Sequence, residues 1–184
     1  PRQQEAIIQL LRLIRDNRNF KYLECSNLRN VTGQEWLPRM KRFPIQNLDL
    51  SGCSSIDSDS LCHFLRECKV SLRHLSLQGC IRIGPAVVDI IAENHTQLLS
   101  LWLGGCSQAI GNRTIHPLLQ NLQHLKHLDL QALKNITDLS GEFTRLLPVS
   151  IQSFNFSSCK QLRLGGIEAL EAIQVHTNHG NQQS

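Results

Sequence analysis

The sequence predicts one α/β domain in which a strand, a turn and a helix are repeated along the chain. One frame of apolar positions recurs six times, at steps of 25 to 27 residues. The six copies begin at Phe20, Ile45, Leu72, Leu98, Leu125 and Ile151. Within a copy, a short segment that alternates apolar and polar residues precedes a stretch with helical spacing. A repeat of this kind predicts a solenoid with a parallel sheet.

Each copy has the same internal order. It has apolar residues at its first, fourth and sixth positions and Cys or Leu at its ninth. The positions between these are free. The best copies are Ile45–Cys53, Leu72–Cys80 and Leu98–Cys106, and the weaker ones are Phe20–Leu28, Leu125–Leu133 and Ile151–Cys159. Three residues later an apolar residue returns, as Val31, Ile56, Ile83, Ala109, Ile136 and Leu162. Since one unit cannot bury both its strand and its helix, neighbouring units must stack into a continuous core.

The helical stretches and the two ends of the chain define the predicted domains. Pro85–Ala92 and Ile167–Val175 have helical spacing, and Pro85 suits a first turn. Residues 1–19 are expected to form an N-terminal helix, as a cap or the remnant of a preceding unit. Its apolar stripe is Ile7, Ile8, Leu10, Leu11 and Ile14. The array is expected over residues 20–176 and a frayed polar tail over residues 177–184.

Composition favours a soluble globular chain. The 41% hydrophobic content argues against disorder, and no apolar run approaches the roughly 18 residues of a membrane span. The N-terminus lacks the layout of a signal peptide. Because the chain begins at Pro1 rather than Met, we expect a processed product or part of a longer protein. A net charge of +4 is too mild to indicate nucleic-acid binding unless it is concentrated on one face.

The frame resembles the leucine-rich repeat (LRR), and in particular its cysteine-containing subtype, whose units of about 26 residues end the strand motif in Cys. Residues typical of the subtype follow as Ile136–Thr137–Asp138 and Ile56–Asp57. The resemblance covers residues 20 to about 175. It implies a right-handed solenoid curved into a horseshoe arc, with the parallel sheet on the concave face. Arrays of this kind are similar to those of the F-box/LRR proteins, in which the array selects substrates for a cullin-based ubiquitin ligase.

The cysteines indicate buried, reduced thiols. Four of the six strand-ending positions are Cys53, Cys80, Cys106 and Cys159. Because Leu28 and Leu133 fill the other two, we interpret the position as an apolar, buried site. Five Asn-x-Ser/Thr sequons would argue for an extracellular glycoprotein. They lie at Asn30, Asn94, Asn112, Asn135 and Asn155. Weighed against thiols without a disulfide pattern, they do not outweigh the prediction of a cytoplasmic or nuclear protein.

We predict neither a metal site nor catalysis. Cys25, Cys62 and Cys68 lack ligand spacing, and His74 and His127 lie two strands apart, about 9.6 Å by strand spacing. The sequence shows no nucleophile elbow, no phosphate-binding glycine loop and no His-Glu-x-x-His motif. Gly104–Gly105 and Gly165–Gly166 are interpreted as turn residues. No cofactor is predicted, and the protein is expected not to be an enzyme.

The residues between the core positions form three rows across the predicted concave face. The first row is Tyr22, Asn47, His74, Ser100, His127 and Ser153. The middle row is Glu24, Asp49, Ser76, Trp102, Asp129 and Asn155. The third row is Ser26, Ser51, Gln78, Gly104, Gln131 and Ser157. Most of these residues are polar, as a solvated strand face requires.

Trp102 is the exception in these rows, because the frame places a large aromatic side chain where exposure is expected. A tryptophan within a polar ring is typical of an interface hot spot; packing against a neighbouring loop is the alternative. Trp36, in the first helical stretch, is expected in core or convex packing. The candidate partner-binding residues are Trp102, His74, Asp129, His127, Asp49, Glu24, Tyr22, Gln78, Gln131 and Asn155.

The sequence therefore predicts a non-enzymatic module that binds a protein partner. The resemblance implies substrate recognition for an F-box-type (SCF) ligase, whose adaptor would be reached through a domain not visible in this chain, since residues 1–19 are too short for an F-box. A stand-alone cytosolic or nuclear scaffold or inhibitor is the first alternative. The second is an RNA or phosphoinositide binder with steeply salt-dependent affinity, although no aromatic stacking platform accompanies the charges. Its basic residues would be Arg39, Lys41 and Arg42, with Lys21, Arg73 and Lys126.

Overall fold

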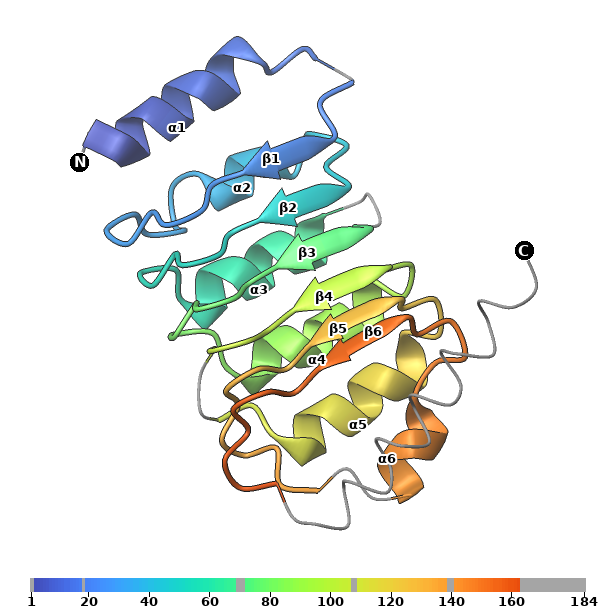
Figure 1. Ribbon diagram of the computed structural model, residues 1–184. Helices are drawn as coiled ribbons and strands as arrows, with labels where there is room; N and C mark the ends of the chain where they lie inside the picture. The colour runs from blue at the N-terminus through green and yellow to red at the C-terminus, as the bar shows by residue number, and fades with distance from the viewer. Residues whose placement is uncertain (1, 18, 69–71, 107–108, 139–140, 163–184) are drawn as a thin grey trace.

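The computed structural model describes residues 2–17, 19–68, 72–106, 109–138 and 141–162, which form a sheet layer and a helix layer (Figure 1). The strands are β1 (Tyr22–Glu24), β2 (Asn47–Asp49), β3 (His74–Ser76), β4 (Ser100–Trp102), β5 (His127–Asp129) and β6 (Ser153–Asn155). Each strand pairs with the next in parallel, so the sheet order is β1-β2-β3-β4-β5-β6. This confirms the predicted α/β class with a parallel sheet and a solenoid-like repetition of units.

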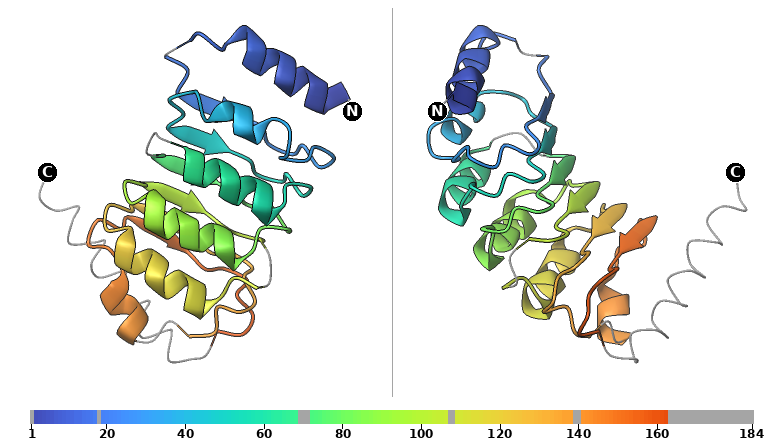
Figure 2. Two further views of the ribbon diagram at one scale, coloured as in Figure 1. Left: turned by 180° about the vertical axis from the view of Figure 1, so that it is seen from behind. Right: turned by 60° about the vertical axis from the view of Figure 1, so that its left-hand side comes forward.

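The helices cover only one face of the sheet. They are α1 (Arg2–Leu13), α2 (Leu37–Met40), α3 (Ser58–Glu67), α4 (Pro85–Asn94), α5 (Asn112–Asn121) and α6 (Gly141–Leu146). Figure 2 shows α2 to α6 on one side of the sheet, in front of it in the left-hand view, with α1 beyond its β1 end. We call the opposite side of the sheet, across which no described helix lies, the open face. The first and third residues of each strand lie on it.

The strands pair in register, so equivalent residues of the frame are neighbours. The central residue of each strand points toward the helices, as Leu23, Leu48, Leu75, Leu101, Leu128 and Phe154. The first five of these side chains are buried, and Phe154 is half-buried. Apolar side chains from strands and helices form one cluster along the stack. This is the continuous core that a repeated strand–helix unit requires.

A left-handed turn follows every strand at the same position of the frame. The φ angles are 59° at Asn27, 70° at Gly52, 71° at Gly79, 66° at Gly105, 58° at Ala132 and 62° at Ser158. The amide of the turn residue donates to the next copy of the frame, as from Gly79 to the Gly104 carbonyl at 2.8 Å. Glycine adopts this conformation without the steric cost of a Cβ atom. The interpretation of Gly105 as a turn residue is therefore confirmed.

The strand-ending cysteines lie beneath these turns, with Cys53, Cys80 and Cys106 at most 1% exposed and Cys159 7% exposed. Each thiol donates to a backbone carbonyl of the preceding copy. The acceptors are Cys25 O for Cys53 at 2.8 Å, Leu50 O for Cys80 at 3.0 Å, Leu77 O for Cys106 at 2.9 Å and Leu130 O for Cys159 at 3.2 Å. Leu133 fills the equivalent place in the fifth copy and is buried. The predicted apolar, buried site is confirmed at these five positions, with a hydrogen bond from each thiol that the sequence alone does not reveal. Leu28, at the sixth position, is half-buried and packs against the core.

Local residue types explain where two of the helices begin, and one of these starts, at Pro85, was predicted. Asp57 caps α3 by accepting a hydrogen bond from the Ser60 amide at 2.8 Å, and Pro85 is the first residue of α4. Trp36 is fully buried, as expected, and its Nε1 donates to the Thr32 carbonyl at 2.8 Å. The first helical stretch itself is short, because α2 has only four residues.

Two expectations about the core are wrong. Ala109 is exposed, and the neighbouring Ile110 is buried in its place. The copy that begins at Leu98 therefore shifts its apolar residue by one position. Leu10 is 44% exposed, so it lies off the buried stripe of α1, which consists of Ile7, Ile8 and Leu11. Only one narrow face of this 12-residue helix packs against the repeated units, and Leu10 lies outside that face.

Several expectations fall outside the described residues. They are the helix at Ile167–Val175, the turn at Gly165–Gly166 and the tail over residues 177–184. Among the helices of the described ranges, none is both long and apolar enough to cross a membrane.

Candidate functional site

The open face carries the three predicted rows in register, and its side chains bond to one another along the stack. In the first row, Nδ1 of His74 lies 2.9 Å from the Ser100 hydroxyl. The same contact recurs between His127 and Ser153 at 2.9 Å. Because the pairs repeat with the frame and Ser100 is only 1% exposed, we interpret them as structural. They hold the imidazoles in a fixed orientation on the face.

The middle row contains an acidic series that also shapes the turns. Oδ1 of Asp49 accepts a hydrogen bond from the Ser51 amide at 2.8 Å, and Oδ1 of Asp129 accepts one from Gln131 at 2.8 Å. Asn155 does the same for the Ser157 amide at 3.0 Å, which shows that an amide can replace the carboxylate in this role. The Asn155 amide also donates to Oδ2 of Asp129 at 2.8 Å. These Asx turns lock the row in place.

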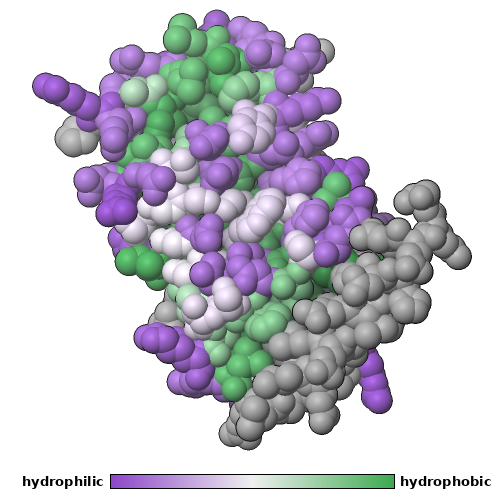
Figure 3. Space-filling model, in the orientation of Figure 1, coloured by the Kyte–Doolittle hydropathy of each residue, from purple (hydrophilic) through white to green (hydrophobic). Residues whose placement is uncertain are grey.

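A hollow of about 290 Å³ lies on the open face over β1 to β4. Its lining consists of Tyr22, Asn47, Leu48, Asp49, His74, Ser76 and Trp102. Tyr22 and Trp102 stand three strands apart, about 14 Å by strand spacing. The smaller side chains of Asn47 and Ser76 lie between them. Two aromatic walls therefore flank a polar floor with one carboxylate, and Figure 3 shows the largely polar character of this face in purple and white.

Trp102 is half-buried rather than exposed as the frame suggested. It pairs with Ser76 on one side and Asp129 on the other. Ser76 is 8% exposed. Gly104, in the third row, is also buried, and a Cβ atom there would lie 2.7 Å from Oδ1 of Asp129. The indole therefore presents only part of its surface to a partner, as a wall of the hollow.

The open face has a negative band between polar residues. Glu24, Asp49 and Asp129 carry its charge, and none of the three rows contains Lys or Arg. Glu24 is exposed and accepts hydrogen bonds from the Tyr22 and Ser26 hydroxyls, both at 3.3 Å. The basic residues nearest these rows lie just ahead of the first row, as Lys21, Arg73 and Lys126. Charge complementarity therefore favours a partner that presents cationic and hydrogen-bonding groups.

The structure brings together some of the predicted residues and separates others. Tyr22, Asp49, His74 and Trp102 line the hollow, with Glu24 bonded to Tyr22 and Asp129 beside Trp102. Glu24 and Asp129 adjoin the hollow without lining it, and His127, Gln78, Gln131 and Asn155 also lie outside its lining. Asn47 and Ser76 were not among the candidates, although they line the floor. The sequence shows their places in the rows. They form a floor only because the larger side chains of Tyr22 and Trp102 stand on either side of them, which the frame does not predict.

The surroundings of His74 favour its neutral imidazole. Burial lowers the pKa of His74, and the charges of His127 and Arg73 lower it further. In the described part of the chain, no group of three or more His, Cys, Asp or Glu side chains is placed to hold a metal ion.

No protein-family model matches the chain. Among solved structures, a chain from the crystal structure of the Rad7 and Elc1 complex in yeast has a TM-score of 0.51 and 16% identity. The match covers 83% of this chain and 54% of that one, so the chain spans about half the length of this neighbour. The tropomodulin C-terminal domain of Caenorhabditis elegans gives a TM-score of 0.43 at 12% identity, covering 95% of this chain and 98% of that domain. The likeness to the first of these structures supports a repeat-type fold for this chain.

Proposed function

We propose that this protein is a non-enzymatic interaction module that binds a protein partner through the open face of its sheet. The observation that carries this proposal is the hollow between Tyr22 and Trp102, with Asp49 in its lining. An aromatic wall beside a fixed carboxylate suits a Lys or Arg side chain, which gains both a cation–π contact and a charge-assisted hydrogen bond. We further propose a leucine-rich-repeat solenoid of six right-handed units with this face on its concave side.

The finer proposal is substrate recognition for an F-box-type ubiquitin ligase, in the cytoplasm or nucleus. It is supported by the resemblance of the frame to the F-box/LRR proteins and by the fold shared with a chain of the Rad7–Elc1 complex, which assembles with a second protein. In this role the open face selects the substrate, and a separate domain contacts the cullin adaptor. A stand-alone scaffold or inhibitor would use the same face without an adaptor.

The test is affinity capture from cell lysate with matched baits. Trp102→Ala removes one wall of the hollow. Asp49→Asn removes the charge but preserves the Asx turn, because Asn155 makes the same turn naturally. Asp89→Asn changes an exposed carboxylate on α4, on the helix side, and is the control. We expect the first two baits to lose partners that the wild type and the control retain.

The outcomes separate the alternatives. Equal recovery of the same proteins by all four baits would contradict binding through the open face. Ubiquitylated partners recovered together with cullin adaptor proteins would support the ligase role. Partners lost with Trp102→Ala but recovered without an adaptor would favour the stand-alone role instead.

A further inference from the structure

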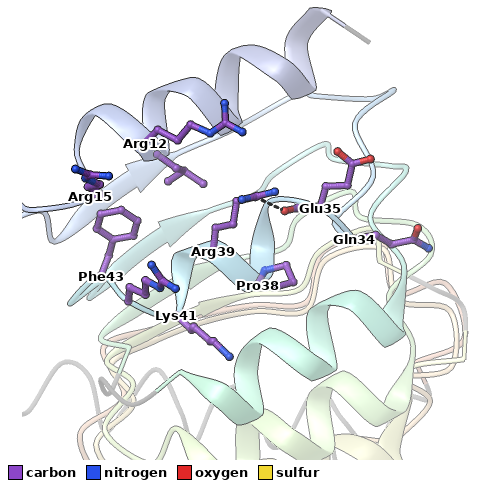
Figure 4. A pocket seen from close by; sticks show the side chains of 10 residues that line it. Arg12, Arg15, Gln34, Glu35, Pro38, Arg39, Lys41 and Phe43 are labelled. Carbon is purple, nitrogen blue, oxygen red and sulfur yellow. Dashed lines mark hydrogen bonds between the residues drawn. The ribbon is translucent and has the colours of Figure 1, made fainter.

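A second surface of different chemistry lies on the helix side, between α1 and α2. It is a groove of about 510 Å³ whose lining consists of Leu11, Arg12, Arg15, Gln34, Glu35, Pro38, Arg39, Lys41, Arg42 and Phe43. Figure 4 shows Arg12 extending from α1 on one side of the groove and Arg39 from α2 on the other. The groove is therefore built from two elements that are separated by β1 in the chain.

The groove concentrates the charge of the protein. Its lining has five cationic side chains and one carboxylate, a formal charge of +4. The whole chain has 19 Lys and Arg against 15 Asp and Glu, also +4. The remainder of the sequence is therefore formally neutral. The net charge of the chain is small, but it is concentrated on this one surface. A concentrated positive charge favours an anionic partner.

Most of the cationic groups retain donors for a ligand. Arg15 pairs with Asp16 at 3.2 Å, but both side chains are more than two-thirds exposed, and such a pair contributes little. Lys41 pairs with Glu67 of α3 at 3.4 Å, and Figure 4 shows it directed away from α1. Arg39 uses Nε for the Glu35 carbonyl at 2.9 Å, which leaves the Nη donors of its guanidinium. Within the described ranges, Arg12 and Arg42 form no ion pair.

The floor of the groove is apolar, and this favours an acidic peptide over a nucleic acid as the anionic ligand. Leu11 is 3% exposed, and Pro38 is half-buried beside it. Phe43, the aromatic residue of the lining, is 4% exposed and packs edge-on against Phe20 at 5.7 Å between ring centroids. Its ring face is not available to stack on a nucleic-acid base. An apolar floor beneath guanidinium groups suits a peptide that carries carboxylates around one apolar side chain.

We infer that the α1–α2 groove binds an acidic segment of a partner protein, with carboxylates on Arg12, Arg39 and Arg42 and an apolar side chain over Leu11 and Pro38. The groove is on the helix side, so this contact leaves the open face available. The protein would thus hold two chains of opposite charge at once, one on each layer.

The test uses fluorescence anisotropy with the full chain and a labelled 12-residue peptide of Asp and Glu around one central Leu. The variant is Arg39→Gln with Arg42→Gln. The control is Arg113→Gln with Lys134→Gln, which removes two exposed cations elsewhere. We expect the groove variant to weaken binding at least about tenfold and the control to change it less than about twofold, since each lost hydrogen bond between charged groups costs about a factor of ten or more. Trp102→Ala should leave the affinity unchanged, which separates this proposal from the function of the open face.

Three results would overturn the inference. The first is absent binding of the peptide, and the second is equal binding by the groove variant at an unchanged melting temperature. The third is binding of a dT12 oligonucleotide or of phosphoinositide vesicles through the same arginines in preference to the peptide, which would make the groove a phosphate site. Replacement of the peptide Leu by Ser should weaken binding; an unchanged affinity would contradict the role of the apolar floor.

Discussion

At the scale of the residue, the six turns require the same left-handed backbone conformation of different residue types. Ala132 has a φ of 58°, where glycine occupies the equivalent place at Gly105. A left-handed conformation costs an L-residue about 1–2 kcal/mol, offset in part by the greater entropy loss of glycine. Ala132→Gly is therefore expected to raise the free energy of unfolding by about 1 kcal/mol or less, as measured by urea denaturation.

The reverse substitution is its matched partner. A Cβ atom at Gly105 would lie 3.8 Å from Gly79 Cα, an ordinary contact, so only backbone strain opposes Gly105→Ala. This variant should lose about 1 kcal/mol. Ala86→Gly, at an exposed position of α4, should also lose stability because glycine weakens a helix. A destabilising Ala132→Gly would contradict the turn assignment.

His95 links the stability of the fold to pH. It is 1% exposed, its Nε2 lies 3.1 Å from the Leu65 carbonyl, and its Nδ1 is the buried side-chain nitrogen left without a hydrogen-bond partner among the described residues. Burial lowers the pKa of this imidazole below its usual 6.5. The unfolded chain therefore takes up a proton near pH 6.5 that the folded protein does not bind, so stability is full above that pH and falls as the pH decreases below it.

The prediction is a smaller pH dependence in His95→Gln, whose amide can still donate to the Leu65 carbonyl. Urea denaturation between pH 7.5 and 5 should show the free energy of unfolding falling less steeply than in the wild type. Part of the slope should remain, because the pKa of His74 is also lowered. His124→Gln, at an exposed position, is the control. Identical slopes for wild type and His95→Gln would exclude a buried neutral imidazole.

At the scale of the element, the strand end, turn and thiol act together. Burial raises the pKa of Cys25 and of Cys106 to about 12 and also raises that of Cys80. At pH 8 these groups remain protonated, and the protonated thiol is a poor nucleophile. Ellman's reagent should therefore react with the strand-end thiols of the native protein only as fast as the chain opens. Cys68, which is half-buried, should react first.

The same reagent tests the predicted compartment. The described residues include all seven cysteines and contain no disulfide, so a denatured sample without reductant should yield close to seven thiols. Fewer than about six would favour an oxidising compartment and reverse the expectation of a cytoplasmic or nuclear protein. Cys68→Ser should remove the fast native phase. Rapid reaction of Cys53, Cys80 or Cys106 in the native state would contradict their burial.

Elements differ in how far the sequence predicts them. The strands and turns follow from the period, because Leu75, Leu101 and Leu128 occupy one position of the frame and must share one core. The prediction that Ala109 is buried was wrong because this copy has one additional residue before its helix, so that Ile110 takes the buried position. The additional residue does not disturb the strand that follows. His95 was missed because a polar residue at a helix end resembles a surface position. Its contact with Leu65 depends on how α3 and α4 pack, which no local pattern contains.

At the scale of the whole molecule, the site is less predictable than the fold. The rows on the open face follow from register alone, yet the hollow depends on the size of side chains on four strands. Trp102 is half-buried because residues of the adjacent strands, Ser76 and Asp129, lie beside it. The frame predicts only the face of the sheet on which its side chain lies. The α1–α2 groove combines Arg12 with Arg39, 27 positions apart. The sequence predicted both the cations at and after α2 and the N-terminal helix, but not that the two would face each other across a groove.

The open face depends on six strands that pair in parallel and in register, because this pairing places Trp102, Asp49 and Tyr22 on one side of the sheet. A slip of one residue would turn every side chain of a strand to the opposite face. Inter-strand NOEs measured by NMR on isotopically labelled protein test the register most directly. We expect backbone cross-peaks that join Ser76 to Trp102 and Trp102 to Asp129. Cross-peaks that instead join Trp102 to Leu75 or Leu128, or an antiparallel pattern, would contradict this pairing.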